Sequence, residues 1–587
     1  GRSGGEPRPA AFLRLAAAQY ADGVSAVGGQ NRPGARQISN VLAAQGEQEI
    51  VNDRMLSAMI YAWGQFIDHD LDLTRGGNSE LMRIPVPAGD PFFDPAGTGT
   101  QTINTFRSAA AAGTGVSRAN PRQQINDITP WLDGSMVYGS SAATAAGLRS
   151  FQGGEMRLGP NGLLPTDANG NFLAGDIRVN ENPGLISLQT LFVREHNYWA
   201  RRLAQANPSW TDEQLFQNAR ERVIGEIQAI TYNEWLPALL GPGALPAYAG
   251  YNPNVNPGIS NEFATAGFRM GHCLLGDEVQ FLDNQGQPIR PGVGLRDAFF
   301  NPELVRQNNI DPILKYLASD PASELDTKLV DGVRNFLFGL PGQGGFDLAA
   351  LNIQRGRDHG LADYNTVRAA LGLPRVTSFA QITTNRELQT RLQQLYGNVN
   401  NIDLWVGGLA EDHVAGGSVG PTLRALISEQ FHRLRAADRF WYERVFTGQA
   451  LSEVRGTTLA DILRRNTSVN NVQPNLFVFN SEIRGVVFVD GNRNGRRDAG
   501  EPLVANRPVG LIDSATGEIL SRTMTDSQGR YRFGVVQGLR TGQYRVAPLL
   551  NDGSAPPVRP GELAIAMSRG EQFVTVDLPV APLLLFG

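Results

Sequence analysis

A short segment near residue 65 places several chemically active side chains inside an otherwise apolar stretch. Residues 63–72 read WGQFIDHDLD, so Gln65, Asp68 and His69 stand at positions i, i+3 and i+4. On an α-helix these three residues share one face, because positions three and four apart are neighbours there. Asp70 follows His69 directly and points about 100° away around the helix axis. The spacing therefore predicts a helix that directs a histidine toward one site and a carboxylate toward another.

The alternative interpretation is a helix end with solvated acids and a histidine satisfied in the core, and the Trp/Phe/Ile frame disfavours it. The segment resembles the distal helix of the animal-type haem peroxidases, the superfamily of myeloperoxidase, lactoperoxidase and the cyclooxygenases, which includes bacterial members. The resemblance implies that His69 is the distal acid and base and that Gln65 contacts the distal water. It also implies that Asp68 forms an ester to haem b and that Asp70 binds calcium.

Peroxide cleavage also needs a cation near the leaving oxygen. Residues 175–182, GDIRVNEN, resemble the family segment in which an arginine is that cation and a glutamate three residues later makes a second haem ester. Arg178 and Glu181 occupy those places. Without the other motifs, the alternative would be a surface arginine and glutamate in a polar loop.

The segment FRMGH, residues 268–272, resembles the proximal helix of the same family. The resemblance implies that His272 ligates the haem iron and that Arg269 faces a haem propionate. Residues 351–360, LNIQRGRDHG, resemble the segment that supplies an asparagine to orient the proximal imidazole, which makes Asn352 that hydrogen-bond acceptor. Asp358 and His359 are expected to hold the start of a helix together. His196 and His432 are also interpreted as structural, and His413, in a Gly-rich loop, has no assigned role.

Two calcium sites are expected. Residues 129–140, TPWLDGSMVYGS, resemble the family's calcium loop, and the implied ligands are the Thr129, Asp133 and Ser135 side chains, the Thr129 and Trp131 carbonyls, and Asp70. Residues 490–501 fit the twelve-position D-x-[DN]-x-[DN]-G-x₅-E calcium loop. Its oxygen ligands would be Asp490, Asn492, Asn494, the Arg496 carbonyl, Asp498 and Glu501. The alternative is an Asx or Ser turn at the first site and a stabilised Asn-Gly turn at the second.

The hydrophobic periodicity predicts two domains. Helical patterns begin at Asn52, which is expected to cap the first long helix, and recur over 185–206, 211–240, 261–275, 421–448 and 457–465. Irregular Gly/Pro/Asn-rich loops are expected between them, including 86–100, 156–171, 240–260 and 398–420. Short strands are predicted over 483–489, 508–513, 519–525, 530–536 and 543–549. These patterns predict a mainly α domain with long loops (1–478), which the motif resemblance implies is a haem peroxidase domain. A small all-β sandwich (479–587) follows, and it resembles the calcium-binding, prealbumin-like B-type repeats of bacterial surface adhesins.

The composition of the chain excludes several kinds of site and partner. The chain has 587 residues, a formal net charge of −5 and one cysteine, Cys273, so intrachain disulfides and cysteine-based metal clusters are excluded. No basic block suggests nucleic acid, and no apolar run approaches the roughly 20 residues of a membrane span. The first residue is Gly1 rather than Met, which fits a processed or trimmed protein. We expect a secreted protein, of bacterial origin, with possible attachment to a cell surface or matrix through its C-terminal module.

The resemblance implies an enzyme that reduces hydrogen peroxide through an oxoferryl intermediate and oxidises bromide, iodide, thiocyanate or aromatic donors. Asn182 stands where myeloperoxidase has the methionine of its third haem link, so two ester links and weak chloride oxidation are expected. Arg269 stands where the cyclooxygenases have their radical-forming tyrosine, which disfavours lipid oxygenation by that route. The alternative function is a catalytically silent, calcium-dependent extracellular matrix or adhesion protein.

Overall fold

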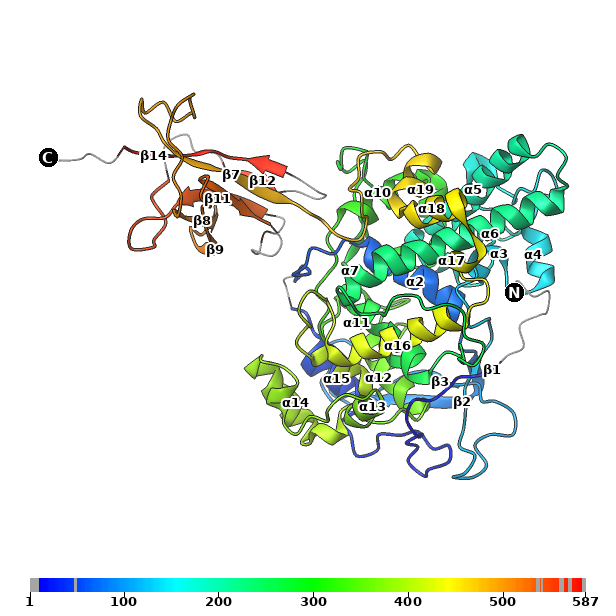
Figure 1. Cartoon of the computed structure of the whole chain (residues 1–587). Helices are drawn as coiled ribbons and strands as arrows, with labels where there is room; N and C mark the ends of the chain where they lie inside the picture. The colour runs from blue at the N-terminus through cyan, green and yellow to red at the C-terminus, as the bar shows by residue number, and fades with distance from the viewer. Residues whose placement is uncertain are drawn as a thin grey trace.

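The computed structural model describes residues 10–46, 50–534, 539, 542–558, 564–567 and 573–582. Figure 1 shows a large helical part followed along the chain by a smaller part built of strands. Each part has its own hydrophobic core, one drawn from residues between Phe12 and Phe477 and the other from residues between Ile483 and Leu578. The predicted fold class, helical first and β-rich second, is confirmed.

The helical elements are numbered in chain order. The α-helices are α1 (Ala35–Ile38), α2 (Met59–Leu71), α3 (Ser135–Tyr138), α4 (Ala142–Leu148), α5 (Pro183–Ala206), α6 (Asp212–Ile230), α7 (Leu236–Leu240), α8 (Leu295–Ala298), α9 (Glu303–Asn308), α10 (Asp311–Ser319), α11 (Asp331–Arg334), α12 (Leu348–Asp358), α13 (Tyr364–Ala370), α14 (Arg386–Tyr396), α15 (Leu404–Ala410), α16 (Pro421–Ala437), α17 (Tyr442–Val445), α18 (Gly448–Gly456) and α19 (Leu459–Asn466). Short 3₁₀ or π-helical segments are η1 (Ser39–Ala43), η2 (Pro160–Gly162), η3 (Val179–Glu181), η4 (Thr231–Trp235), η5 (Phe263–Gly267), η6 (Phe268–Leu274), η7 (Phe379–Gln381) and η8 (Val399–Asn401). Within the described residues, no helix combines the length and the hydropathy that crossing a bilayer requires.

The strands form small pairs in the helical part and a sandwich at the C-terminal end. They are β1 (Ala10–Ala11), β2 (Gly76–Pro85), β3 (Thr102–Ser108), β4 (Ile125–Asn126), β5 (Glu278–Val279), β6 (Val293–Gly294), β7 (Glu482–Val489), β8 (Pro508–Asp513), β9 (Ile519–Met524), β10 (Arg530–Phe533), β11 (Gly542–Pro548), β12 (Ile565–Met567), β13 (Phe573–Thr575) and β14 (Leu578–Val580).

In the C-terminal part, the described residues form two sheets. One has the order β10-β7-β13, with β14 also paired to β7, and the other has the order β12-β11-β8-β9. Inward side chains of both sheets, such as Ile483 and Val487 of β7 and Leu511 of β8, are fully buried. The five predicted strands match β7 to β11 in order, although residues 535 and 536 of the fourth lie outside the described residues.

Helix α2 lies in the middle of the helical core. Trp63 and Phe66 are fully buried, and the Phe66 ring stacks on Phe192 of α5 with a centroid separation of 5.1 Å. The prediction that Asn52 caps this helix is wrong. Its Oδ1 accepts hydrogen bonds from the backbone N–H groups of residues 54 and 56, and Met55 has a φ of 54°, so the chain turns before α2 begins at Met59.

Two other predictions for the helical part, one of a loop and one of a helix, need correction. The predicted loop over 398–420 contains a buried helix, α15, whose Gly407 lies against Tyr364 so closely that a Cβ there would stand 2.4 Å from the ring. The segment was predicted to be a loop because it is rich in glycine, but Gly407 instead permits close packing of a helix. The predicted helix over 261–275 is not a regular α-helix, because it consists of the π-helical η5 and the 3₁₀-helical η6.

A buried ionic network joins α1 to the start of α12. Arg36 is fully buried and donates to both carboxylate oxygens of Asp90 (2.7 and 3.0 Å) and to Asp347 (2.7 Å). Asp347 is also the N-cap of α12, since its Oδ1 accepts from the N–H of Ala350 at 3.0 Å. Burial raises the pKa of Asp90, but the hydrogen bonds from Arg36 and Asn40 outweigh it and hold that pKa well below its usual range.

Replacing Arg36 by leucine should lower the free energy of unfolding of the helical domain by about 3–5 kcal/mol at neutral pH, because two carboxylates would remain buried without their cation. Since the folded pKa of Asp90 lies below the unfolded value of about 3.9, the stabilisation is present above that pH and is lost as the pH falls. Urea unfolding across pH should therefore show the Arg36→Leu deficit shrinking in acid. The matched control is Arg75→Leu, which removes an exposed bidentate pair with Asp127 and should cost less than about 1 kcal/mol. Equal losses in both variants would contradict the prediction.

Candidate active site

The polar residues of α2 lie at its C-terminal end, as the spacing predicts. His69 is buried, and its Nε2 lies 3.8 Å from Glu181 Oε2. Gln65 Nε2 donates to the same Glu181 oxygen at 2.9 Å. Gln65, His69 and Glu181 are thus gathered in one cluster from two segments more than 100 residues apart in the chain.

Arg178 contacts the end of α2 directly. Its guanidinium forms a bidentate pair with Asp176, with Nε and Nη2 at 2.8 and 2.9 Å from the two carboxylate oxygens. Nη2 also donates to the Asp72 carbonyl at 2.9 Å, and Nη1 lies 3.9 Å from Asp68. A cation at the C-terminal end of a helix complements its dipole and satisfies a carbonyl that the helix leaves free. Arg178 therefore fixes the end of the helix that carries His69.

The side chain of His69 has an unused nitrogen. Its buried Nδ1 has no hydrogen-bond partner among the described residues, since Asp176 Oδ1 lies 3.7 Å away. Burial, and next the positive charge of Arg178, lower the pKa of His69 to about 3, so the imidazole is neutral at ordinary pH. A neutral imidazole can accept a proton, which is what a general base requires.

The two carboxyls expected to bind haem are only partly covered. The side chains of Asp68 and Glu181 each retain 28% of their accessible surface, whereas His69 and Asp176 retain 4%. Burial is the main reason that the pKa of Asp68 rises to about 6 and that of Glu181 to about 7; Arg178 opposes both shifts.

On the proximal side, η6 places Arg269 and His272 on one face, because residues at i and i+3 align in a 3₁₀-helix. Helix α2 packs against η6, so both histidine-bearing segments share one core. The fully buried Asn352 of α12 contacts both η6 residues: its Nδ2 lies 2.8 Å from His272 Nδ1, and its Oδ1 accepts from Arg269 at 3.2 Å. Burial, followed by the charge of Arg269, lowers the pKa of His272 to about 3.

The orientation of the Asn352 amide differs from the expected one. An acceptor for a His272 Nδ1–H would be the Oδ1 atom, but the structure turns Nδ2 toward the imidazole and gives Oδ1 to Arg269. The two arrangements are related by a 180° rotation of the amide. After that rotation Arg269 would keep no acceptor on Asn352, and only its Nε would still donate, to the Ala264 carbonyl at 3.3 Å. The Nη groups would then be available for an anionic partner.

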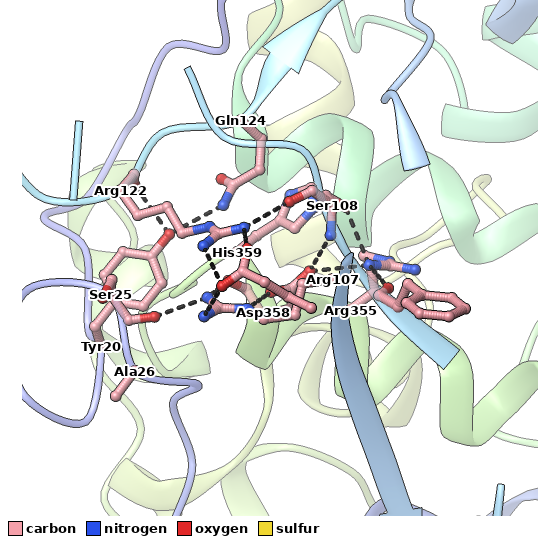
Figure 2. A network of polar contacts seen from close by, with 12 residues as sticks. Tyr20, Ser25, Ala26, Arg107, Ser108, Arg122, Gln124, Arg355, Asp358 and His359 are labelled. Carbon is pink, nitrogen blue, oxygen red and sulfur yellow. Dashed lines mark hydrogen bonds and ion pairs between the residues drawn. The ribbon is translucent and has the colours of Figure 1, made fainter. Parts of the chain in front are cut away.

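A polar network at the end of α12 holds the proximal elements together (Figure 2). Asp358 accepts from Arg107 Nε at 2.6 Å, from the Ser108 N–H at 2.8 Å and from Arg355 at 2.9 Å. His359 lies between Ser108 Oγ on one nitrogen and Thr265 of η5 on the other, at 2.7 and 2.9 Å. The network therefore joins α12, β3 and η5. It lies at the C-terminal end of α12, so the expectation that Asp358 and His359 hold a helix start is wrong.

Asp70 points to a different set of residues from His69. Its carboxylate accepts from the Gly134 N–H at 2.9 Å and from Ser135 Oγ at 2.7 Å. Asp133 accepts from the Ser135 N–H at 3.2 Å and from Thr129 Oγ1 at 3.4 Å. Burial and the nearby charge of Asp133 raise the pKa of Asp70 to about 8. The side chains expected as calcium ligands are thus brought together, and the half-buried Trp131 lies in the same loop.

The second expected calcium loop lies in the C-terminal part, between β7 and β8. Asp490 accepts from the N–H groups of Asn494 and Gly495 at 3.1 and 2.8 Å, and Asp498 accepts from the Asn492 and Asn494 side chains at 2.7 Å each. Glu501 accepts from the N–H groups of residues 491 and 498, both at 2.9 Å. Arg496 lies in the same exposed loop. Asp490 is buried and Glu501 is half-buried, whereas residues 491–500 are exposed, in contrast to the fully buried Asp70.

Sequence reasoning missed two residues of the distal cluster. Asp176 holds Arg178, and Asn182 both caps α5 through the Leu185 N–H (2.9 Å) and donates to Gln65 Oε1 at 2.7 Å. Asp176 lies two residues before the predicted cation, where a carboxylate can reach the guanidinium of the same turn. Asn182 stands before Pro183, and Asn followed by Pro is a helix-start signal that could have revealed its capping role.

The residues present fit a haem group. A buried histidine, partly exposed carboxyls and a guanidinium lie on α2 and within residues 178–181, at η3. A second histidine with an asparagine partner lies on η6, which packs against α2. Asp68 and Glu181 would be the ester carboxyls, His272 the iron ligand and Arg269 a partner for a propionate.

Comparison with known proteins agrees with this arrangement. Residues 7–477 match the animal haem peroxidase family, and residues 481–557 match the SdrD B-like domain. The chain is 39% identical to Peroxinectin A of Dictyostelium discoideum over 472 residues, which cover 76% of this chain and 88% of that protein. It is 38% identical to human myeloperoxidase, covering 81% of this chain and 72% of that protein, and 35% identical to Drosophila melanogaster peroxidasin, of which it spans 35%.

Among solved structures, Peroxidase A from Dictyostelium discoideum superposes with a TM-score of 0.74 at 37% identity, covering 80% of this chain and 96% of that one. A fatty acid alpha-dioxygenase of Arabidopsis thaliana shares the fold alone, at 21% identity and a TM-score of 0.68 over 80% of each chain. With a family match over most of its length and extensive peroxidase relatives, the chain belongs to the animal haem peroxidase family and is a haem peroxidase enzyme.

Proposed function

We propose that the enzyme reduces hydrogen peroxide and oxidises bromide, iodide, thiocyanate or aromatic donors. The observation that carries the proposal is the distal cluster, in which a neutral buried His69, Gln65 and a firmly held Arg178 surround one end of α2. When bound, haem supplies the iron that takes up the oxidising equivalents of peroxide and passes them to the donor.

Each distal residue has a distinct task in this proposal. His69 takes a proton from the peroxide oxygen nearest the iron and returns it to the departing oxygen. Arg178 stabilises the negative charge that develops on that departing oxygen. Because Asp176 already orients the guanidinium, little reorganisation is needed when that charge appears. Gln65 orients the water or peroxide next to His69.

The test is peroxide turnover by the haem-loaded chain with guaiacol, bromide and thiocyanate as donors. Replacing His69 by alanine should slow peroxide reduction by roughly 10²–10⁴-fold, the usual contribution of a general base, while the Soret band of bound haem persists. The matched control is His432→Ala, which removes an exposed histidine of α16 and should leave the rate unchanged. A wild-type chain with a Soret band but without turnover of any donor would favour the silent matrix protein instead.

We also propose that Asp68 and Glu181 form ester links to haem. Both carboxyls are partly exposed beside buried residues, and an ester removes the cost of holding two carboxylates in this environment. Asn182, which follows Glu181, caps α5 and has no atom that could form a third link of the sulfonium type.

After exposure to peroxide, haem should resist acid-acetone extraction from the wild type, and peptides containing Asp68 and Glu181 should carry its mass. Each single variant, Asp68→Asn or Glu181→Gln, should retain one link, and the double variant should release haem fully because neither carboxyl remains. Glu303→Gln, which removes an exposed carboxyl of α9, is the control and should behave as the wild type. Freely extractable haem in the wild type would refute the ester proposal.

We further propose that Ca²⁺ binds between Asp70 and the 129–135 loop and in the 490–501 loop. Support comes from the donor set, which consists of hard oxygen atoms, and from two carboxylates brought together in the first site without a cationic side chain within 4.0 Å among the described residues. An ion in the first site would hold α2 from the side opposite Arg178.

Chelation by EGTA should therefore lower the Tm of the helical domain and change the haem spectrum, since Asp70 adjoins His69. Asp70→Asn should lower that Tm in calcium and remove most of its response to EGTA. Asp498→Asn should change only the transition of the C-terminal domain, which makes it the matched control for the second loop. The first site would be ruled out if EGTA changed neither the Tm nor the spectrum of the wild type.

We propose an extracellular location, in a bacterium, with the C-terminal module serving for attachment to a surface or matrix. The match of this module to the SdrD B-like domain and its exposed calcium loop support the proposal. Millimolar calcium outside cells suits exposed loops of modest affinity.

A further inference from the structure

A second group of metal-ligating side chains lies away from the haem and calcium sites. Asp53, Glu324 and His413 come from three distant segments, yet each offers one ligand atom and these atoms all lie within 4.8 Å of one another. The three side chains open into a cleft of about 540 Å³. Sequence reasoning gave His413 no role, because its partners are remote in the chain.

The imidazole of His413 is oriented by the backbone. Its Nε2 lies 2.8 Å from the Leu325 carbonyl, which can only accept a hydrogen bond, so Nε2 carries the proton. In the neutral ring the lone pair is then on Nδ1, which faces Glu324 Oε1 at 4.0 Å. A histidine held by a backbone carbonyl through one nitrogen, with the other nitrogen free, is the usual arrangement of a metal ligand.

Glu324 is held in a comparable way. Its Oε1 accepts from the Leu325 N–H at 2.7 Å and from Asn52 Nδ2 at 3.1 Å, and its Oε2 accepts from the Asp53 N–H at 2.7 Å. These three bonds leave acceptor capacity on the carboxylate, since its two oxygens offer about four lone-pair positions. Glu324 is therefore fixed in place but still able to bind a cation.

The charge around the group is unbalanced. Among the described residues, no lysine or arginine lies within 4.0 Å of the Asp53 or Glu324 carboxylate. The cleft is lined by six acidic residues, with only Lys328 and Arg391 as basic ones. Two of the acids have an arginine partner, Glu387 in Arg391 and Glu411 in Arg368, so most of the remaining negative charge has no arginine partner in an ion pair.

We propose that Asp53, Glu324 and His413 bind a divalent transition-metal ion such as Zn²⁺. One imidazole and two carboxylates suit this class of ion, whereas Ca²⁺ prefers oxygen ligands alone. Ligands about 2.1 Å from a tetrahedral Zn²⁺ ion stand about 3.4 Å apart, so the most widely spaced ligand atoms must approach each other by up to about 1.4 Å. The exposed Asp53 side chain can make that movement.

Such an ion would clamp the chain segments that support both histidines of the haem site. Asn52 donates its N–H to the Ala322 carbonyl at 2.9 Å just before α2, and the Ser323 N–H donates to the Leu274 carbonyl at the end of η6 at 3.1 Å. A metal bridge between residues 53 and 324 would therefore join the entry of α2 to the exit of η6.

The test is calorimetric titration of the haem-loaded full chain with Zn²⁺ in millimolar calcium, which keeps the calcium loops filled. The wild type should bind one ion at this site, and the same ion should raise its Tm. Asp53→Asn and His413→Gln each remove one ligand from a partly or fully exposed position, and each should weaken binding by roughly tenfold or more. Both variants should also lose the Zn²⁺-dependent rise in Tm.

Two controls separate a built site from general attraction. His432→Gln removes an exposed histidine elsewhere, and Glu387→Gln removes a carboxylate of the same cleft outside the group. Both should bind Zn²⁺ within about twofold of the wild type, well inside the tenfold loss expected for a ligand. The proposal is overturned if the wild type does not bind, if Asp53→Asn and His413→Gln bind as it does, or if either control loses as much affinity as they do.

Discussion

The bidentate pair between Asp176 and Arg178 is the interaction on which the distal side of the site depends. Arg178 alone would be a costly charge beside the end of α2, because burial opposes it. Asp176 supplies the opposite charge, and the Asp72 carbonyl at the helix end accepts a further hydrogen bond from Nη2. The contacts that offset the desolvation cost of the Arg178 guanidinium also fix its position relative to His69. The Asp176–Arg178 pair therefore both stabilises the charge at the end of α2 and fixes the geometry of the distal cluster.

The other carboxylates of the region lack such a partner, and this difference separates supporting residues from candidate ligands. Asp176 has a lowered pKa because Arg178 outweighs its burial, whereas burial raises the pKa of Asp70 and Glu181. A group that the protein leaves without compensation is one that an external species can stabilise. Calcium binding would offset the cost of burying the Asp70 carboxylate, and ester formation would remove the charge of Glu181.

The sequence predicted the fold class and the local placement of Gln65, His69 and Asp70, because helical periodicity fixes which neighbours share a face. It could not predict contacts that depend on distant segments. The hydrogen bond between Asn182 and Gln65 joins residues 117 positions apart, and the side chains of Asn352 and Arg269 meet across 83 positions. Helix α15 was missed because Gly407 serves close packing against Tyr364, a reason that composition does not reveal. The sequence likewise could not predict the orientation of the Asn352 amide, because either His272 or Arg269 can donate a hydrogen bond to its Oδ1 atom.

Burial also distinguishes the two expected calcium loops. In the 490–501 loop, the Asn492 and Asn494 amides and several backbone N–H groups already satisfy Asp490, Asp498 and Glu501. A cation there would compete with existing hydrogen bonds and with water, so occupancy should follow the surrounding calcium concentration. Asp70 is fully buried beside Asp133, and water cannot easily replace an ion at that position. If both loops bind Ca²⁺ as proposed, the first would hold its ion as a lasting part of the peroxidase core, whereas the second would exchange its ion with the surroundings of the C-terminal module.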